Sequence, residues 1–284
     1  MPQLVIIGGS DAGISAALRA CELDPSVAVT VVVADAFPNY SICGLPFYLS
    51  GETPDWHMLA HRTADEITAQ GITLLLNHTA RRIEPTQRQV VVEDEHGQGQ
   101  ALSYDRLIVA TGAEPHRPAI AGLDLPGVYL LHTMADSFAV HAHLDALEEQ
   151  RATSGRLTTR RPRAAIVGGG YIGLELADAF RHRGLDVTLV QRGPSLLNTV
   201  EPEIGDRIAN ELRRHGVEVV LGATVGSIVS TRSDDEGDPY TAPFFVEGAQ
   251  EDGGWVSVAA DIVVAPTGVR PVTQLAQEAG CALG

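Results

Sequence analysis

The chain has 284 residues, of which 20 are Lys or Arg and 36 are Asp or Glu, so its formal net charge is −16 at neutral pH. Phosphate contacts along a nucleic acid are made chiefly by Lys and Arg, and this excess of acidic residues excludes a nucleic-acid partner. No apolar run reaches the roughly 20 residues of a membrane-spanning helix, and the N-terminus lacks a signal-peptide pattern. The composition therefore predicts a globular cytoplasmic protein with no membrane partner.

The first 33 residues have the pattern of a dinucleotide-binding unit. A short apolar run at residues 4–7 leads into Gly8-Gly-Ser-Asp-Ala-Gly13, a helix-forming stretch at 14–21 follows, and residues 27–33 supply a second strand. In such a strand–loop–helix unit Gly8 permits the tight turn, Gly13 lets the helix pack closely on the strand, and the helix N-terminus receives a pyrophosphate.

Two positions complete this first unit. Ser10 replaces the middle glycine of the usual pattern, where it narrows the space for phosphate but can donate a hydrogen bond to it. Asp35 follows the second strand and is the candidate acid for the ribose hydroxyls of the nucleotide.

The segment 39–51 carries a lone cysteine, Cys43, directly before Gly44-Leu45-Pro46. With Cys21 and Cys281 far away in the sequence, the spacing predicts neither a disulfide framework nor a zinc site, and each thiol is expected to be free. A helix opened by Gly-Leu-Pro would favour the thiolate of Cys43, which is the nucleophilic form. The alternative is that Cys43 is a small buried apolar residue, as we expect for Cys21 and Cys281.

His57 and His61 stand four residues apart, a spacing that could ligate a metal ion. No third ligand and no H-E-x-x-H glutamate accompany them, so we predict no metal site. Thr63 and Glu66 predict a capping box at the start of a helix over residues 63–70 that Gly71 ends. The strands expected next are residues 72–76, 80–83 and 90–93, followed by an exposed turn at 95–100.

Residues 104–113 form a strand pattern that ends in Ala-Thr-Gly, and the prolines after it mark a crossover into a second domain. A helix is expected at 133–150. The arginine-rich stretch 151–163 could meet a phosphate-bearing ligand, but we favour a solvated surface connector.

Gly168, Gly170 and Gly173 form a complete dinucleotide fingerprint between an apolar strand and a helix. After the next strand, at 187–190, the expected acid is replaced by Gln191-Arg192. An acid there would bind the ribose 2′-hydroxyl of NAD, whereas an uncharged residue beside Arg accepts a 2′-phosphate. This loop therefore predicts NAD(P)H binding and favours NADPH.

The last part of the chain is expected to hold a helix at 202–214, strands at 217–221 and 261–266, and acidic, turn-rich hairpins over 233–252. The final strand leads into Thr267-Gly-Val-Arg-Pro271.

The two glycine loops, the Ala-Thr-Gly strand, the Thr-Gly-Val-Arg-Pro segment and the lone cysteine together resemble the flavin-dependent pyridine nucleotide-disulfide oxidoreductases. The resemblance is greatest to the single-cysteine branch of coenzyme A disulfide reductases, NADH oxidases and persulfide reductases. It implies an α/β fold of two Rossmann-like domains, the second inserted in the first. The implied domains are an FAD-binding domain over 1–117, an NAD(P)H-binding domain over 118–260 and a returning FAD-domain segment over 261–284.

The resemblance also implies site residues. For FAD these are Gly8, Ser10, Gly13 and Asp35, with Thr111 and Gly112 nearby; for NAD(P)H they are Gly168, Gly170, Gly173, Gln191 and Arg192; the catalytic residues are the redox thiol Cys43 and Glu175 near the nicotinamide.

The chain departs from the family in three ways. Asp11 replaces a His of the peroxidase-like members, which disfavours peroxide as substrate, and Asn39-Tyr-Ser-Ile-Cys43 replaces the usual Ser-Phe-x-x-Cys. Related proteins continue past the position of Gly284 into a Gly-Asp segment and a dimerisation domain. We therefore expect the chain to be either a fragment or a reduced relative without the C-terminal domain, and to form a homodimer only where that domain is present.

The expected function is that of an FAD-dependent NAD(P)H oxidoreductase that reduces a disulfide, persulfide or oxygen-type acceptor through Cys43. One alternative is an electron-transfer reductase for ferredoxin or rubredoxin, which needs no thiol. Another is a truncated nucleotide-binding protein without catalysis.

Overall fold

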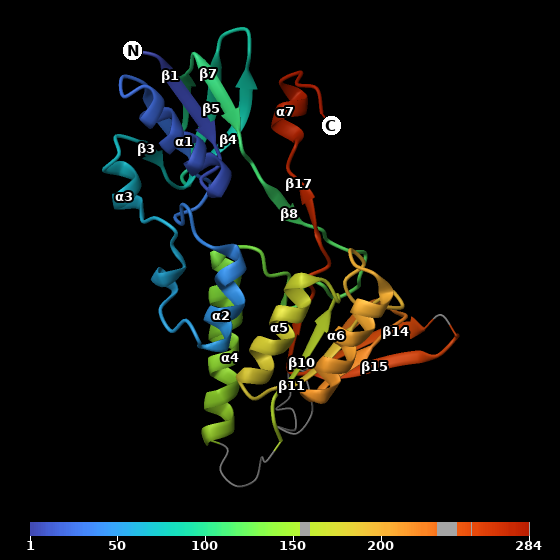
Figure 1. The fold of residues 1–284 in the computed structure, drawn as a ribbon. Helices are drawn as coiled ribbons and strands as arrows, with labels where there is room; N and C mark the ends of the chain where they lie inside the picture. Colours follow the sequence, from blue (N-terminus) through green and yellow to red (C-terminus); the bar gives the residue numbers. More distant parts are fainter. Residues whose placement is uncertain (154–159, 232–242, 251, 284) are drawn as a thin grey trace. The chain divides into compact units, whose positions relative to one another are not determined.

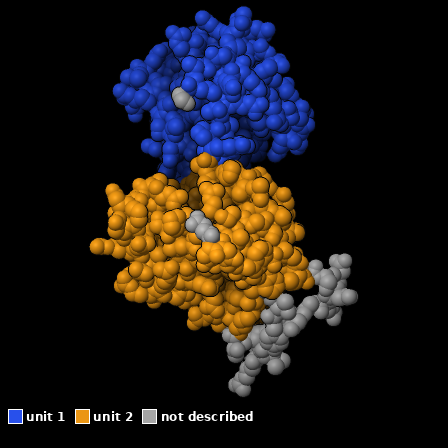
Figure 2. Space-filling model, turned by 90° about the vertical axis from the view of Figure 1, so that its right-hand side faces the viewer, with its two compact units in different colours: residues 1–41, 56–114, 270–284 blue, residues 42–55, 115–269 orange. Residues whose placement is uncertain are grey.

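The computed structural model describes residues 1–153, 160–231, 243–250 and 252–283. The chain forms two compact units, drawn in different colours in Figure 2. Unit 1 comprises Met1–Ser41, Trp56–Glu114 and Arg270–Gly284, and unit 2 comprises Ile42–Asp55 and Pro115–Val269. Unit 2 is thus inserted into unit 1, as predicted, but at two places, because the short segment that carries Cys43 also belongs to unit 2.

Unit 1 is built on a parallel sheet in the strand order β3-β2-β1-β7. Its helices and strands are β1 (Gln3–Ile7), α1 (Asp11–Leu23), β2 (Ala28–Val32), η2 (Trp56–Leu59), α3 (Ala64–Thr68), β3 (Thr73–Leu75), β4 (His78–Glu84), β5 (Gln89–Asp94), β6 (Gly99–Ser103), β7 (Arg106–Val109) and α7 (Gln274–Glu278). The expected βαβ unit is present, since β1 pairs in parallel with β2.

Strand β1 is buried on both faces, as central strands of parallel sheets are. Leu4 and Ile6 pack with Ile14 of α1 in one apolar cluster. Val5 and Ile7 pack on the other face, in a cluster with residues of the antiparallel sheet β4-β5-β6. The first glycine loop is therefore carried by a strand that apolar contacts hold from two sides.

The predicted capping box on α3 is confirmed. The backbone N–H of Thr63 donates to Glu66 Oε2 at 2.8 Å, and the N–H of Glu66 donates to Thr63 Oγ1 at 3.2 Å. The helix ends earlier than predicted, at Thr68, and Gly71 follows with a φ of 83°.

The end of the chain returns to unit 1 beside the Ala-Thr-Gly segment. Strands β8 (Ala113–Pro115) and β17 (Val269–Pro271) pair with each other. Just beyond them, Thr111 Oγ1 donates to the carbonyl of Val272 at 2.6 Å. The N–H of Val272 donates to the carbonyl of Gly112 at 3.0 Å. The two segments are far apart in sequence but are joined by the strand pairing and by these two hydrogen bonds.

Unit 2 contains a second parallel sheet, in the order β12-β11-β10-β16-β9, and an antiparallel sheet β13-β14-β15. Its helices and strands are η1 (Ile42–Gly44), α2 (Leu45–Ser50), β9 (Val128–Tyr129), α4 (Met134–Thr153), β10 (Arg163–Val167), α5 (Tyr171–His182), β11 (Asp186–Val190), α6 (Pro202–Arg214), β12 (Val217–Val220), β13 (Ala223–Ser230), β14 (Phe244–Gln250), β15 (Trp255–Ala260) and β16 (Ile262–Val264). Figure 1 shows α2 alongside α4 and α5, and α2 packs against both.

The boundaries of unit 2 differ from those predicted. The sequence placed residues 261–266 in the returning FAD segment, whereas β16 pairs with β10, Val264 opposite Ile166, and also with β9. This strand completes the sheet of unit 2, so the chain leaves that unit after Val269 rather than after residue 260. At the other end, unit 2 resumes at Pro115 rather than at residue 118.

The antiparallel sheet of β13, β14 and β15 was not predicted, because the sequence indicated only turn-rich hairpins over part of this region. Residues 232–242 and 251 of that prediction lie outside the described part of the chain. Strands β6 and β9 were not predicted either, and the start of β6 overlaps the turn expected at 95–100.

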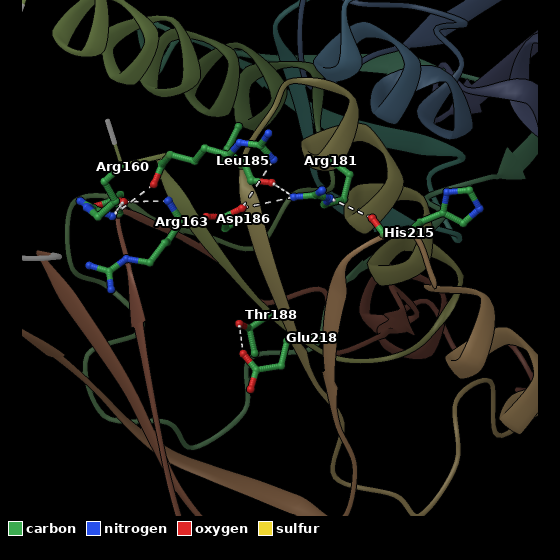
Figure 3. Close-up of polar contacts among 10 residues, drawn as sticks. Arg160, Arg163, Arg181, Leu185, Asp186, Thr188, His215 and Glu218 are labelled. Atoms are coloured by element: carbon green, nitrogen blue, oxygen red, sulfur yellow. Dashed lines mark hydrogen bonds and ion pairs between the residues drawn. The ribbon is translucent and has the colours of Figure 1, made fainter. Parts of the chain in front are cut away.

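Part of the arginine-rich stretch is not the solvated connector that we expected. Arg160 makes two hydrogen bonds, of 2.8 and 2.9 Å, to the carboxylate of Asp261, which is buried. The N–H of Arg163 donates to the same carboxylate at 2.7 Å. Figure 3 shows Arg160 and Arg163 at these contacts. Because a buried carboxylate needs paired donors, these arginines hold the start of β10. Residues 154–159 lie outside the described part of the chain.

Within the described ranges, no helix is both long and apolar enough to cross a membrane.

Candidate functional site

The second glycine loop is held by backbone contacts that exclude side chains. Gly168 has a φ of 127°, and an added Cβ would lie 2.8 Å from the carbonyl oxygen of Pro266. A Cβ on Gly173 would lie 1.9 Å from the carbonyl oxygen of Gly168. These two glycines are required by the fold of the loop, because one turns the chain and the other lets α5 approach β10.

Gly170 differs from the other two glycines of the fingerprint, Gly168 and Gly173. Its φ and ψ are −86° and −173°, an extended conformation that any residue adopts, and it precedes the first turn of α5. A Cβ added there meets nothing within 4 Å. The protein's own packing therefore does not require glycine here, and Gly170 lines the cavity described next.

Gly170→Ala is expected to fold normally and to lose NADPH affinity by roughly 10- to 100-fold. The methyl group would occupy the approach of the pyrophosphate to the amides of the loop, and a charge-assisted hydrogen bond contributes about 1.5–3 kcal/mol. The measurement is an NADPH titration by fluorescence, with the melting temperature recorded in parallel. Gly99→Ala is the control, because a Cβ at Gly99 makes its nearest contact at 3.9 Å, an ordinary van der Waals distance, and Gly99 lies in β6 of unit 1 and does not line the cavity. Unchanged affinity in Gly170→Ala would contradict this role.

A cavity of about 670 Å³ opens beside this loop, entirely within unit 2. This volume lies within the range of small-molecule sites. Its walls are formed by residues 116, 118–120, 167–172, 190–192, 197–199, 223–225 and 266–269. Four of the five residues predicted for NAD(P)H, or their backbone, therefore lie on one cavity: Gly168, Gly170, Gln191 and Arg192. Gly173 lies behind the loop, against Gly168.

Gln191 has a contact that the sequence did not suggest. Its side chain is buried, and its Oε1 accepts a hydrogen bond from the N–H of Gly169 at 3.0 Å. Its Nε2 donates to Asn198 Oδ1 at 3.3 Å. Gln191 thus braces the glycine loop. Arg192, the next residue, is exposed at the same cavity and carries the positive charge there.

The first glycine loop, in unit 1, repeats this construction. A Cβ on Gly8, whose φ is 116°, would lie 2.0 Å from the carbonyl oxygen of Ala110, and one on Gly13 would lie 1.9 Å from that of Gly8. Ser10 has φ −88° and ψ −167°, nearly the values of Gly170, and is exposed. The residues present therefore fit a pyrophosphate at the N-terminus of α1, as the FAD of a flavoprotein requires.

The acidic residues of unit 1 are engaged locally. Asp35 Oδ1 accepts the N–H of Phe37 at 2.8 Å, three residues after the end of β2. Asp11, at the start of α1, accepts from Asn39 Nδ2 at 2.8 Å and lies 3.0 Å from His61 Nδ1. Asn39 and His61 were not predicted as partners of this loop, because nothing local in the sequence links positions so far apart.

The two histidines considered for a metal make separate contacts. The ring of His57 stacks on Trp56, with ring centres 3.7 Å apart, whereas His61 contacts Asp11. Within the described ranges, no group of three His, Cys, Asp or Glu side chains is placed to hold a metal ion.

Cys43 is exposed and lies in η1, the turn that leads into α2. Gly-Leu-Pro opens a helix as predicted, with Gly44 as its N-cap and Pro46 in the first turn. Cys21 is half-buried, and burial raises the pKa of its thiol. Cys281 is exposed, so the prediction that it is buried was wrong: it follows α7, which buries no residue of its own.

Glu175 lies on α5, one turn beyond Tyr171, and is not among the residues that form the cavity walls. Glu175 is exposed to solvent as a whole, yet partial desolvation of its carboxyl group raises the pKa of that group above the usual value. The carboxyl group therefore holds a proton more readily than an ordinary surface glutamate.

The fold and both loops allow comparison with known proteins. The family model for pyridine nucleotide-disulphide oxidoreductases matches residues 2–284. The chain belongs to this family. Among curated relatives, the NAD(P)H sulfur oxidoreductase (CoA-dependent) of Pyrococcus abyssi is 34% identical over 99% of this chain and 56% of the relative. The chain spans little more than half the length of three of the curated relatives it matches.

Solved structures agree. The NAD-dependent persulfide reductase of A. fulgidus superposes with a TM-score of 0.83 at 29% identity, over 99% of this chain and 48% of that one. An engineered water-forming NADPH oxidase, derived from the Lactobacillus brevis NADH oxidase, has a TM-score of 0.79 and a sequence identity of 28%. The match covers 97% of this chain and 56% of the oxidase. A putidaredoxin reductase in complex with putidaredoxin has a TM-score of 0.80 and a sequence identity of 27%. The match covers 100% of this chain and 62% of that one. The α/β fold predicted from the sequence is confirmed.

Proposed function

We propose that the chain is the nucleotide-binding part of an NADPH-dependent flavoprotein that reduces a small disulfide or persulfide through Cys43. The observation that carries the proposal is the placement of Cys43 within unit 2. It is exposed, and it lies in η1, two residues before α2, which packs on α5, the helix that follows the second glycine loop. A thiol that reacts with a substrate must be accessible, whereas a structural cysteine is usually buried.

Unit 1 would hold FAD, which is expected for this family together with NAD(P)H. Gly8, Ser10 and Gly13 would receive the pyrophosphate at the start of α1, Asp35 would bind the ribose, and Thr111 and Gly112 would lie near the cofactor. A bound flavin supplies the transfer of electrons from a nicotinamide hydride to sulfur. The protein's contribution is to bind, orient and shield the reacting groups.

Unit 2 would bind NADPH in the cavity beside Gly170. Arg192, which lines this cavity, would offer its guanidinium to the 2′-phosphate, and the uncharged Gln191 would not repel it. The engineered NADPH oxidase supports this preference. Its five substitutions include an aspartate-to-alanine change and, at the next position, an alanine-to-arginine change. This chain has an uncharged residue followed by arginine, Gln191-Arg192, directly after β11.

The proposed chemistry at Cys43 is the reduction of a sulfur–sulfur bond. In the oxidised form its Sγ is bonded to the sulfur of a small thiol or persulfide. Two electrons and one proton break that bond, giving the Cys43 thiolate and the substrate thiol, or sulfide where the bound sulfur came from a persulfide. The thiolate then attacks the next disulfide or persulfide, which restores the bond to Cys43 and releases the other half of the substrate as a thiolate. Glu175, with its raised pKa, is proposed to hold a proton near the nicotinamide.

A second candidate is an electron-transfer reductase that passes electrons from NADPH to a small redox protein. Its supporting observation is the similarity to putidaredoxin reductase, and it needs no thiol. The experiment that separates the two asks whether NADPH releases a thiol held on Cys43 in a mixed disulfide. Release supports the thiol mechanism, and retention of that thiol while the flavin is reduced supports the electron-transfer reductase.

A further inference from the structure

We propose that Arg183 is a positioning residue that holds the Cys43 segment onto the NAD(P)H-binding unit by joining the helices α2, α4 and α5. The proposal rests on the proposed redox role of Cys43 for its functional consequence. The structural part stands separately and is tested separately.

Arg183 ends α5 as its C-cap, and its side chain is only 11% exposed. Its Nε donates to Glu148 Oε1 at 2.7 Å and its Nη2 to Asp145 Oδ1 at 2.8 Å, both on α4. Its Nη1 donates to the backbone carbonyl of Leu49, in α2, at 3.3 Å. One guanidinium therefore contacts two other helices from the end of a third, which a lysine ammonium could not do in a fixed planar geometry.

Helix α2 needs such a contact because it has only six residues. Isolated helices of that length are not stable in water, and the last carbonyls of any helix lack partners within it. Leu45 and Leu49 are 1% and 0% exposed, which anchors one face of α2 by apolar packing. The hydrogen bond from Arg183 satisfies a carbonyl in the last turn, before Gly51 ends the helix.

A second contact joins α2 to α4 at the same place. The ring of Tyr48 stacks on His141, with ring centres 4.6 Å apart, and His141 Nδ1 lies 3.0 Å from Asp145 Oδ2. Burial, followed by the charge of Asp145, raises the pKa of Tyr48, so its phenol stays neutral. Asp145 thus contacts both Arg183 and His141, and the two contacts to α2 share one carboxylate.

The position of Cys43 follows from these contacts. It lies two residues before α2, in η1, and is exposed. The turn has no buried residue of its own. With little packing at Cys43 itself, α2 fixes the chain on the C-terminal side of the thiol, and Arg183 is a polar group that ties the far end of α2 to the unit.

The first test compares Arg183→Met with Arg181→Met in the full chain by amide hydrogen exchange. Arg181 is the matched control. It lies on the same helix, is 22% exposed, and donates to the carbonyl of Leu185 at 2.7 Å and to Asp186 at 3.3 Å (Figure 3). Arg183→Met is expected to speed exchange in residues 42–51 by about tenfold, the loss expected for one charge-assisted hydrogen bond. Arg181→Met should leave that segment unchanged. Equal exchange in both variants would overturn the proposal.

The second test uses the FAD-loaded protein. Arg183→Met is expected to lower kcat for a small disulfide by about tenfold while the rate of flavin reduction by NADPH and the KM for NADPH stay within about twofold of the original. Arg183→Lys should recover part of that loss. A purely structural role would lower both half-reactions together with the melting temperature. If exchange rises but Cys43→Ser keeps full turnover, the positioning stands and the proposed redox role fails.

Discussion

Replacing Cys43 by Ser is expected to lower the turnover of a small disulfide by roughly three orders of magnitude or more, while NADPH reduces the bound flavin at the original rate. A serine hydroxyl neither forms nor exchanges a disulfide, and removal of an essential nucleophile commonly has effects of this size. Because Cys43 is exposed, the substitution leaves no cavity, and the melting temperature should not change. Steady-state turnover and anaerobic stopped-flow flavin reduction measure the two steps separately.

The matched controls for this prediction are Cys21→Ser and Cys281→Ser. Neither residue lies in the Cys43 segment, Ile42–Asp55 of unit 2, so both variants should retain turnover. The loss should therefore be confined to one of three cysteines. Turnover that survives in Cys43→Ser would show that the thiol is incidental and would favour the electron-transfer reductase.

Replacing Arg192 by Ala is expected to weaken NADPH binding by roughly 30- to 100-fold and to leave NADH binding within about twofold. The guanidinium would lose its charge-assisted contacts with the 2′-phosphate, about 2–3 kcal/mol, and NADH has no such group. Nucleotide titrations at two salt concentrations provide the measurement, because the NADPH difference should shrink as salt screens the charge.

Arg207→Ala, an exposed arginine on α6 that does not line the cavity, is the control for the change in net charge. Both nucleotides should bind it as they bind the original chain. If Arg192→Ala weakens the binding of NADH and of NADPH equally, Arg192 supports the structure of the loop and does not bind the 2′-phosphate.

The parts of the fold that the sequence predicted correctly are those with local signatures. The turns at Gly8 and Gly168 could be predicted from the local sequence alone, because a glycine loop between an apolar strand and a helix is a short, distinctive pattern. The helix over 202–214 was predicted to the residue, since a proline at its start and a change of periodicity after it mark both ends.

What the sequence did not predict depends on contacts between distant segments. The assignment of β16 to unit 2 follows from its pairing with β10, and the assignment of the Cys43 segment follows from α2 packing on α4 and α5. The hydrogen bond from Gly169 to Gln191 and the bonds of Arg183 have the same origin. The site residues were named from the motif, but the groups that hold them were visible only in three dimensions.

The most direct measurement begins with a chain that carries Cys21→Ser and Cys281→Ser, in which Cys43 is converted to a mixed disulfide with a chromophoric aromatic thiol. NADPH is then added without oxygen, with and without bound FAD. NADPH and a proton are expected to reduce the bond, giving NADP⁺, the Cys43 thiol and one equivalent of coloured thiol per chain, only when FAD is bound. Flavin that NADPH reduces while the coloured thiol stays on Cys43, or equal release without FAD, would contradict it.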